Sequence, residues 1–315
     1  MPRSSPRRRR RRRSRRPRWA TARWGPARSR SVHPSWRETV TGSSIGEVTS
    51  QSAIDAAVQR LAEAQATRVP CAAVRDLIGT DDLDAAYAVQ QGLVQARIAG
   101  GVTVVGRKIG ATSKAVQDQL GVDQPDFGYL LSDMDVSAGA AEGADPIGMA
   151  TLVQPRVEAE VAFRLARDVD DAEITIDSVR DAVEVALPAL EIVDSRIGDW
   201  DITFTDTVAD NASSGLYVVG SDGVPLSELE PREVEMSLTI NGEVRSSGNG
   251  AACLGDPLEA LRWLAVQCRR FGDPLRAGQV VLSGALGPFV PFVAGDEVTA
   301  TISGFAPLTV SFRED

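Results

Sequence analysis

An unbroken run of arginines near the start of the chain, Arg7 to Arg13, limits which part of the sequence can fold. Residues 1–40 contain 15 arginines and a single acidic residue, Glu38. Like charges at this density repel one another and cannot pack into a core. We therefore expect a disordered Arg-rich extension over residues 1–48 and one folded domain over residues 49–315.

The extension and the folded domain carry opposite charges, which bears on the partners of the chain. The sequence has 34 basic and 43 acidic residues, and setting residues 1–40 aside leaves 19 basic and 42 acidic residues, a net charge of −23. Such a domain repels nucleic-acid phosphates and lipid headgroups. An Arg-rich arm can bind polyanions, so a nucleic-acid-binding or interaction protein driven by the extension is a rival hypothesis. We expect no nucleic-acid or membrane partner and an extension that does not contribute to the main activity.

The sequence has no feature that directs it to a membrane or a secretory pathway. No stretch approaches the roughly 20 consecutive apolar residues of a membrane-spanning helix. The arginine run is not followed by the apolar region of a secretory signal. We therefore expect a cytoplasmic protein.

Histidine is absent from the part of the chain that is expected to fold, because the only one is His33. This excludes Ser-His-Asp and Cys-His catalytic groups from the folded domain. It also excludes zinc, copper or iron sites with histidine ligands. Acid–base chemistry then falls to Asp, Glu, Lys, Tyr or water. A metal site would consist of oxygen ligands, which favours Mg²⁺ or Mn²⁺ and less strongly Ca²⁺.

Apolar periodicity and turn residues predict an α+β protein with a helical part up to about residue 100 and a mixed β core after it. The predicted helices cover residues 52–66, 80–99, 113–120, 177–187 and 257–271. The predicted strands cover residues 102–109, 157–165, 190–193, 216–219, 233–240, 243–246, 280–283, 297–302 and 308–312. Residues 121–150, which are rich in Asp, Gly and Pro, are expected to form a long connection.

Two glutamates in the predicted strand 157–165 stand out. Alternate side chains of a strand share a face, so Glu158 and Glu160 lie on one side and the apolar residues on the other. Their Cβ atoms are then about 6–7 Å apart. A solvated strand face explains this spacing, and so does a cation bound between two buried carboxylates.

A third glutamate favours the metal site. Glu191 lies in an apolar segment, residues 189–193, where an isolated carboxylate is costly unless it is paired or bound to a metal. Three such carboxylates would form a site for a hard cation, with open positions for substrate and water.

Further candidates each also have a purely structural reading. Lys108, at the end of an apolar strand, is either an exposed strand terminus or a partly buried amine with a lowered pKa that acts as a base or polarises a carbonyl. Asp126, close to proline and glycine, is typical of a turn. Loops of small residues place Ser213, and also Ser283 and Gly284, where hydroxyl and backbone N–H groups could bind a substrate carboxylate.

Four segments taken together resemble one enzyme family, the 2-keto-4-pentenoate (2-hydroxypenta-2,4-dienoate) hydratases of the fumarylacetoacetate hydrolase superfamily. The resemblance extends from about residue 52 to the C-terminus, and the extension matches nothing in the family. The segments are GRKIGATSKAVQDQLGVDQPDFG (106–128), QPRVEAEVAF (154–163), LPALEIVDSRIGDWDITFTDTVADNASSG (187–215) and VLSGALGP (281–288).

The resemblance implies a mixed β-roll or sandwich with flanking helices, and a homo-oligomer. It also implies that three glutamates bind Mg²⁺ or Mn²⁺, that a lysine and an aspartate act in catalysis, and that a serine lies in the substrate loop. In this sequence those positions are Glu158, Glu160, Glu191, Lys108, Asp126 and Ser213. Ala111 departs from the family pattern, which usually has a larger apolar residue there, so the chain length of the substrate stays open.

The activity implied by the resemblance is the metal-dependent addition of water to 2-hydroxypenta-2,4-dienoate or a close homologue. The product is 4-hydroxy-2-oxopentanoate, in the meta-cleavage catabolism of aromatic compounds. The 4-oxalocrotonate decarboxylases share the metal site and remain an alternative, and so does a complex with a decarboxylase of the same pathway. Hydrolysis of a C–C bond is disfavoured, because that chemistry usually relies on a dyad that contains histidine.

Overall fold

Two long antiparallel strands, β4 (Pro155–Leu165) and β5 (Val183–Asp194), form the centre of the fold in this computed structural model. Glu158 lies directly opposite Glu191 in their register. The structure describes residues 49–314, except 115–116, 118–121 and 142. The predicted extension 1–48 and most of the predicted helix 113–120 therefore lie outside the described residues.

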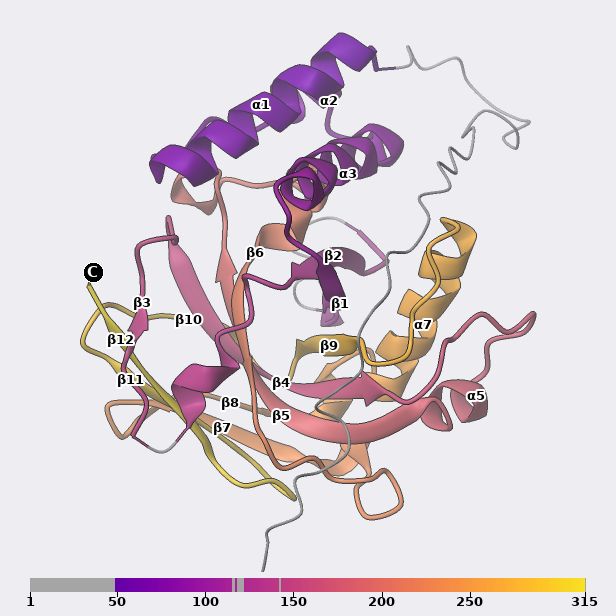
Figure 1. The fold of residues 1–315 in the computed structure, drawn as a ribbon, viewed down its shortest axis with the longest axis vertical. Coiled ribbons are helices and arrows are strands. Elements are labelled where there is room, and N and C mark those ends of the chain that lie inside the picture. Colours follow the sequence, from indigo (N-terminus) through magenta and orange to yellow (C-terminus); the bar gives the residue numbers. More distant parts are fainter. Residues whose placement is uncertain (1–48, 115–116, 118–121, 142, 315) are drawn as a thin grey trace, which may run out of the picture. The chain divides into compact units, whose positions relative to one another are not determined.

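The larger sheet brings segments from the whole length of the domain beside β4 and β5 (Figure 1). Its order is β2-β1-β9-β4-β5-β6, with β10 also paired to β4. All neighbours pair antiparallel except β1 and β9, which run parallel. The other strands of this sheet are β1 (Val104–Gly110), β2 (Asp126–Leu131), β6 (Ser214–Val219), β9 (Val280–Ala285) and β10 (Val290–Pro291).

The predicted helix over 177–187 is wrong. A short helix, α5 (Ile176–Arg180), ends earlier, and β5 begins at Val183. The β-branched residues Val183 and Val185 suit a strand, and β4 offers a partner along this stretch. Pro188 lies within β5, where its carbonyl accepts a hydrogen bond from the backbone N–H of Gly220. Proline thus marks a position inside a strand and not the end of a helix.

The expectation that residues 121–150 form a long connection is also wrong in part. Asp126–Leu131 is the fully buried strand β2, which pairs with β1. The short strand β3 (Ile147–Gly148) follows later and joins the second sheet. Tertiary pairing with β1 outweighs the turn signals of Pro125 and Gly128.

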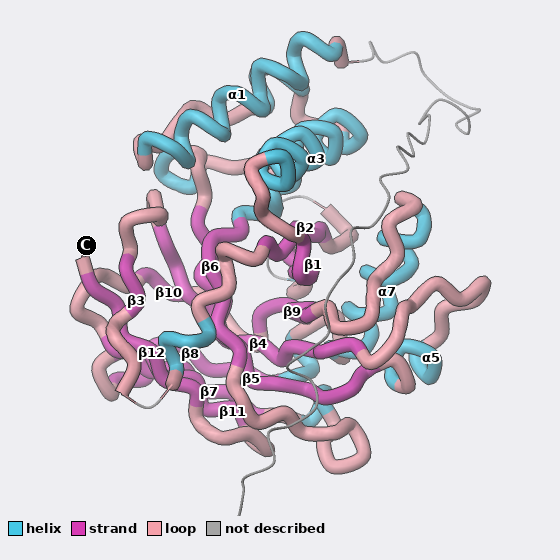
Figure 2. Tube along the Cα trace, viewed as in Figure 1, coloured by secondary structure: helices cyan, strands magenta, loops and turns pink. Residues whose placement is uncertain are grey.

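The second sheet packs against β5 and closes the main core. Its order is β3-β12-β11-β7-β8, and β11 and β12 contact β5 (Figure 2). Asn241 and Gly242 form a two-residue hairpin turn between the predicted strands 233–240 and 243–246, both with positive φ. The fold is therefore α+β with two packed mixed sheets, as expected. The strands of this sheet that are new here are β7 (Glu235–Ile240), β8 (Glu243–Asn249), β11 (Glu297–Ile302) and β12 (Leu308–Arg313).

The N-terminal helices form a separate layer with a core of their own. Leu61 and Ala57 of one helix pack with Val89 and Ala86 of another and with Val208 of a third. The side chains of Ser50 and Asp82 cap the N-termini of the first and second of these three helices. The helices of this layer are α1 (Gln51–Thr67), α2 (Arg75–Ile78), α3 (Leu83–Ala99) and α6 (Phe204–Ala209).

The last long helix, α7 (Pro257–Arg270), covers β9 and contacts α5.

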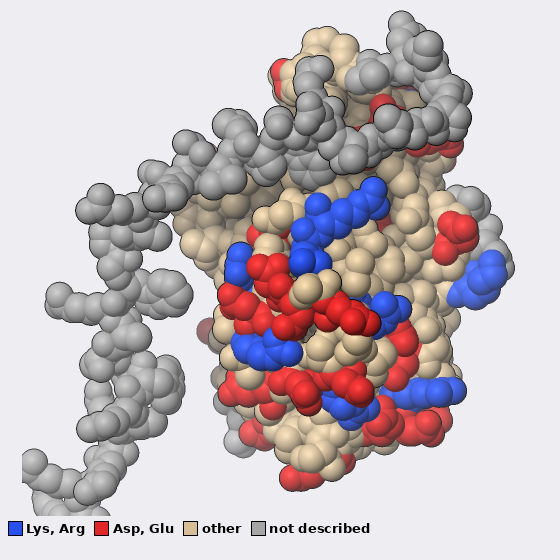
Figure 3. All heavy atoms as spheres, turned by 90° about the vertical axis from the view of Figure 1, so that its right-hand side faces the viewer, with Lys and Arg blue, Asp and Glu red and all other residues tan. Residues whose placement is uncertain are grey.

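On the face shown in Figure 3, acidic side chains gather in patches that single Lys and Arg residues interrupt. Exposed ion pairs on the described surface, such as Arg276–Asp168 at 2.9 Å, contribute little to stability. Among the described residues, no helix is both long and apolar enough to cross a membrane.

One buried aspartate joins two helices of the N-terminal helical layer, α2 and α6, the second of which lies beside the site described below. Asp206 Oδ1 accepts hydrogen bonds from the backbone N–H groups of Val74 and Arg75, at 3.0 and 2.8 Å. Its Oδ2 accepts from the Arg75 guanidinium and from the backbone and hydroxyl of Thr203. The Arg75 guanidinium also pairs with Asp201, whose side chain is 76% exposed, whereas that of Asp206 is 0% exposed.

We predict that Asp206→Ala lowers the free energy of unfolding by about 3–5 kcal/mol, because it leaves buried donors and the Arg75 charge without a partner. The control Asp201→Ala removes the exposed partner of the same arginine and should cost less than about 1 kcal/mol. Urea unfolding of both variants measures the difference. Equal effects would show that Asp206 does not fasten this layer.

Candidate active site

Three glutamates meet on one face of the β4–β5 pair. Glu158 and Glu160 alternate along β4, and Glu191 lies across from Glu158 on β5. One carboxylate oxygen from each lies within 4.8 Å of the other two. The exposed fractions of these residues are 7%, 0% and 1%, so the solvated strand face that also fits the sequence is not what forms here.

The three carboxylates have few hydrogen-bond partners for groups so deeply buried. Glu160 Oε2 accepts from the backbone N–H of Gly284 at 2.7 Å. Glu160 Oε1 and Glu191 Oε2 accept no hydrogen bond from any described residue. Buried carboxylate oxygens without donors are costly. The three converging carboxylates form an oxygen-only set of ligands, which suits a hard divalent cation. The residues present therefore fit the metal site that the sequence predicts.

Burial and mutual repulsion disfavour the ionised forms of these glutamates. Burial, followed by the charge of Glu191, raises the pKa of Glu158 to about 7. Burial and the charges of Glu191 and Glu158 raise the pKa of Glu160 well above its ordinary value. The pKa of Glu191 is also raised by burial, although Lys108 partly offsets the effect. Without a cation, the cluster is a concentration of unfavourable charge.

Lys108 of β1 supplies the ammonium group beside the cluster. Its Nζ lies 3.1 Å from Glu191 Oε1, and its side chain is 3% exposed. Burial lowers the pKa of this amine, but the charges of Glu191, Glu158, Asp126 and Glu160 outweigh burial and raise it above the ordinary value. The expectation of a lowered pKa is therefore wrong, since the sequence does not show how many carboxylates surround the amine.

Asp126 is the fourth buried carboxylate of the site. It begins β2 opposite Gly110, where an added Cβ would lie 2.2 Å from Asp126 Oδ1, so this close approach requires glycine. Oδ1 accepts no hydrogen bond within the described part of the chain. Burial, against the partial offset of Lys108, raises the pKa of Asp126 to about 6. Asp126 is thus a strand residue with a perturbed carboxyl and not a turn residue.

A cavity of about 650 Å³ opens above these groups. Lys108, Asp126 and Glu158 contribute to its wall, together with Ser213 and Ala111. Glu160 and Glu191 do not contribute to the wall. One concave site therefore brings together Lys108, Asp126, Glu158 and Ser213. A concave site is the usual form of a small-molecule site.

Ser213 reaches the cavity from a strained turn. Asn211, Ala212 and Ser213 all have positive φ, from 52° to 54°, which is costly for residues other than glycine. The side chain of Asn211 holds the turn by bonding both the backbone N–H and the carbonyl of Tyr129 in β2. The Ser213 hydroxyl lies 3.2 Å from that of Thr207, which also lines the cavity.

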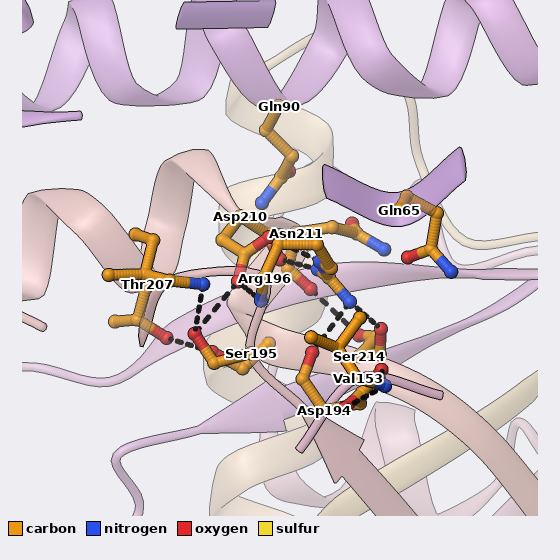
Figure 4. Close-up of polar contacts among 12 residues, drawn as sticks. Gln65, Gln90, Val153, Asp194, Ser195, Arg196, Thr207, Asp210, Asn211 and Ser214 are labelled. Atoms are coloured by element: carbon orange, nitrogen blue, oxygen red, sulfur yellow. Dashed lines mark hydrogen bonds and ion pairs between the residues drawn. The ribbon is translucent and has the colours of Figure 1, made fainter. Parts of the chain in front are cut away.

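A buried ion pair stabilises the same turn from behind (Figure 4). The Arg196 Nε lies 2.5 Å from Asp210 Oδ1, and both side chains are almost completely buried. Arg196 also donates to the carbonyls of Asp194 and Ser214, at 2.6 Å each, and to that of Asp210. The guanidinium thus ties the end of β5 to the start of β6 on either side of the turn.

Ser283 and Gly284 lie behind Glu160 and do not contribute to the cavity wall. The Ser283 hydroxyl is fully buried and has no hydrogen-bond partner among the described residues. Gly284 has φ +113°, and a Cβ there would clash with Thr112 at 2.4 Å. The backbone N–H of Gly284 holds the Glu160 carboxylate through its 2.7 Å hydrogen bond. Contact of Ser283 or Gly284 with a substrate remains a prediction.

Sequence reasoning missed several residues of the cavity wall, including Thr207, Arg156, Trp200 and Phe289. Arg156 lies on the same face of β4 as Glu158, and its guanidinium packs over the rings of Trp200 and Phe289. The alternation that placed Glu158 and Glu160 on one face also applies to Arg156, so the signal was present. Nothing in the sequence places Trp200 or Phe289 beside it, because they lie on separate loops.

Comparison with known proteins identifies the family to which this fold belongs. Residues 109–313 match the model of the fumarylacetoacetate (FAA) hydrolase C-terminal domain. A 4-oxalocrotonate decarboxylase from Pseudomonas putida G7, complexed with magnesium and adipate, superimposes with a TM-score of 0.77 at 27% identity, covering 84% of this chain and 98% of that one. The class is therefore that of the fumarylacetoacetate hydrolase fold.

Curated relatives narrow the family. A 2-keto-4-pentenoate hydratase from Burkholderia vietnamiensis is 50% identical, covering 81% of this chain and 95% of that protein. A 2-hydroxyhexa-2,4-dienoate hydratase from Comamonas testosteroni is 42% identical, covering 81% of this chain and 96% of that protein. The chain belongs to the 2-keto-4-pentenoate hydratase family of the fumarylacetoacetate hydrolase superfamily.

We predict that Glu160→Gln stabilises the metal-free protein, because it removes one of three repelling charges and keeps an acceptor for Gly284. At about pH 8 in EDTA its thermal midpoint should exceed that of the wild type by roughly 2–4 °C for each kcal/mol gained. Glu243→Gln, at an exposed position of β8, should leave the midpoint unchanged. A midpoint of Glu160→Gln below the wild-type value would contradict the account of the charge cluster.

Proposed function

We propose that this enzyme is a hydro-lyase that adds water to 2-hydroxypenta-2,4-dienoate or its six-carbon homologue in the catabolism of aromatic compounds. The observation that carries the proposal is the buried carboxylate cluster, with Lys108 and Asp126, at one cavity of a chain in this family. The hydratases above are 42–50% identical to the chain, whereas the decarboxylase is 27% identical. This difference favours hydration over decarboxylation.

Glu158, Glu160 and Glu191 would hold a divalent cation, for which we propose Mg²⁺ or Mn²⁺. The unpartnered oxygens of Glu160 and Glu191 support this, as does the magnesium in the related decarboxylase. When bound, such a cation supplies Lewis-acid polarisation of the 2-oxo group of the substrate. Gly284 would keep Glu160 oriented toward it through the 2.7 Å hydrogen bond.

Asp126 and Lys108 would move the protons. Asp126, with its free Oδ1 and a pKa of about 6, accepts the proton of the 2-hydroxyl, and the ammonium of Lys108 delivers a proton to C5, which gives the 2-oxo-3-enoate. Lys108 then accepts a proton from the water whose oxygen adds to C4. Asp126 returns its proton to C3, so both groups regain their starting state and one water has been added.

The hydroxyl pair of Ser213 and Thr207 would position the substrate. Both residues line the cavity, and their oxygens lie 3.2 Å apart, close enough to bind one carboxylate together. The strained turn and the Arg196–Asp210 pair keep Ser213 in place before the substrate arrives. Such preorganisation is typical of positioning groups in active sites.

The assembly and the location of the enzyme stay predictions. The family resemblance implies a homo-oligomer and allows a complex with a decarboxylase of the same pathway. We propose both, and a cytoplasmic location, as consequences of the pathway role.

We expect the full chain with Mg²⁺ or Mn²⁺ to consume 2-hydroxypenta-2,4-dienoate, followed by loss of its ultraviolet absorbance, and to form 4-hydroxy-2-oxopentanoate. EDTA and Glu160→Ala should each abolish this activity, and re-adding metal should restore only the EDTA-treated wild type. Release of CO₂ from 4-oxalocrotonate without hydration would instead assign the chain to the decarboxylases. Hydration that persists in Glu160→Ala with EDTA present would disprove the metal site.

The acidic limb of the pH profile should report Asp126. Since its carboxylate must be ionised to accept a proton, kcat/KM should fall as the pH decreases through about 6 and be constant above it. Asp126→Asn should lower kcat/KM by about 10²–10⁴ and remove this limb. Asp123→Asn, an exposed aspartate in the same segment, should keep the wild-type profile. An unchanged acidic limb in Asp126→Asn would rule out this role.

A further inference from the structure

Arg156 is a cation of the cavity wall that has no counter-charge among the described residues. Within the described part of the chain, it forms no ion pair or side-chain hydrogen bond, whereas Lys108 of the same wall is paired with Glu191. Residues 41–315 carry a net charge of −23, so an unpaired, partly buried guanidinium at the active site is unexpected. Burial lowers the pKa of Arg156, and no nearby acid compensates.

Two aromatic rings fix the position of this guanidinium. Its Cζ lies 4.4 Å from the ring centre of Trp200 and 4.9 Å from that of Phe289. The two rings stack with centroids 5.7 Å apart, and the Trp200 indole N–H donates to the Gln154 carbonyl at 3.1 Å. The guanidinium therefore lies over both rings, and no described residue bonds its N–H groups, so Arg156 can bind a planar anion through them.

The position of Arg156 in β4 separates it from the carboxylate cluster. Two residues along a strand advance about 6.8 Å, so Arg156 lies one such step beyond Glu158 on the shared face, on the side away from Glu160. A ligand whose first carboxylate is bound by Ser213 and Thr207, as proposed above, would extend its carbon chain along the cavity toward Arg156. A five-carbon monoacid brings only an apolar end there, whereas a linear six-carbon diacid brings a second carboxylate.

We propose that Arg156, held against Trp200 and Phe289, forms a subsite for the distal carboxylate of linear C6 dicarboxylates. The inference rests on the proposed function, because the first carboxylate is placed by the site described there. Dicarboxylates of this class, saturated or unsaturated, then compete with the monoacid substrate for the cavity. Compounds that still carry the carboxyl group which a decarboxylation would remove therefore inhibit the enzyme.

The first test compares two saturated probes of equal length on the full chain with Mg²⁺. Binding of adipate and hexanoate is measured by isothermal titration calorimetry, and their inhibition constants are measured where hydration is observed. We expect adipate to bind at least about tenfold more tightly, as one charged hydrogen-bonded pair provides. Equal affinities would overturn the subsite. Binding is measured without turnover, so absence of hydration would count against the proposed function alone.

The second test uses variants of Arg156 and a matched arginine of the same strand. Arg156→Gln should abolish the preference for adipate and leave the affinity for hexanoate within about twofold, and Arg156→Lys should retain part of the preference. Arg164→Gln, which changes a β4 residue outside the cavity wall, should behave as the wild type. Thermal unfolding of all three variants shows whether they fold. A preference that survives in Arg156→Gln, or an equal loss of affinity for both probes, would overturn the proposal.

Discussion

Repulsion among the buried carboxylates of Glu158, Glu160 and Glu191 is the interaction on which the rest of the site depends. Strand pairing places Glu158 opposite Glu191, and the β pleat places Glu160 on the same face, so the backbone register brings the three together. Almost no water reaches them, and one ammonium does not balance their charge. Such an arrangement is costly for stability and becomes favourable when a divalent cation is bound.

The surrounding structure keeps this unfavourable cluster in place. Both strands lie in the middle of a sheet, and a second sheet packs behind β5. Parallel pairing of β1 with β9 brings Lys108 from one part of the chain and Gly284 from another to the same glutamates. In the helical layer, Asp206 joins α6 to α2, and α6 contacts the turn that carries Ser213. Sequence segments about 180 residues apart thus form one rigid site.

The sequence predicted local features well and their environments less well. Alternation defined β4 and the shared face of Glu158 and Glu160, and the sequence also predicted the helices near residues 52–66, 80–99 and 257–271. The predictions from sequence were wrong where tertiary strand pairing determines the local structure. At Asp126 the neighbouring proline and glycine suggest a turn, but pairing with β1 makes the residue part of a strand. The expected direction of the pKa shift of Lys108 was wrong for the same reason. That direction depends on four carboxylates from other strands.

Direct measurement of metal binding tests the central claim most simply. The full chain, stripped with EDTA, is titrated with Mn²⁺, and bound metal is counted by electron paramagnetic resonance and calorimetry in the wild type and in Glu191→Gln. The account predicts one Mn²⁺ per chain for the wild type and no binding by Glu191→Gln at concentrations that saturate the wild type. Failure of the wild type to bind Mn²⁺, or unchanged binding by Glu191→Gln, would contradict it.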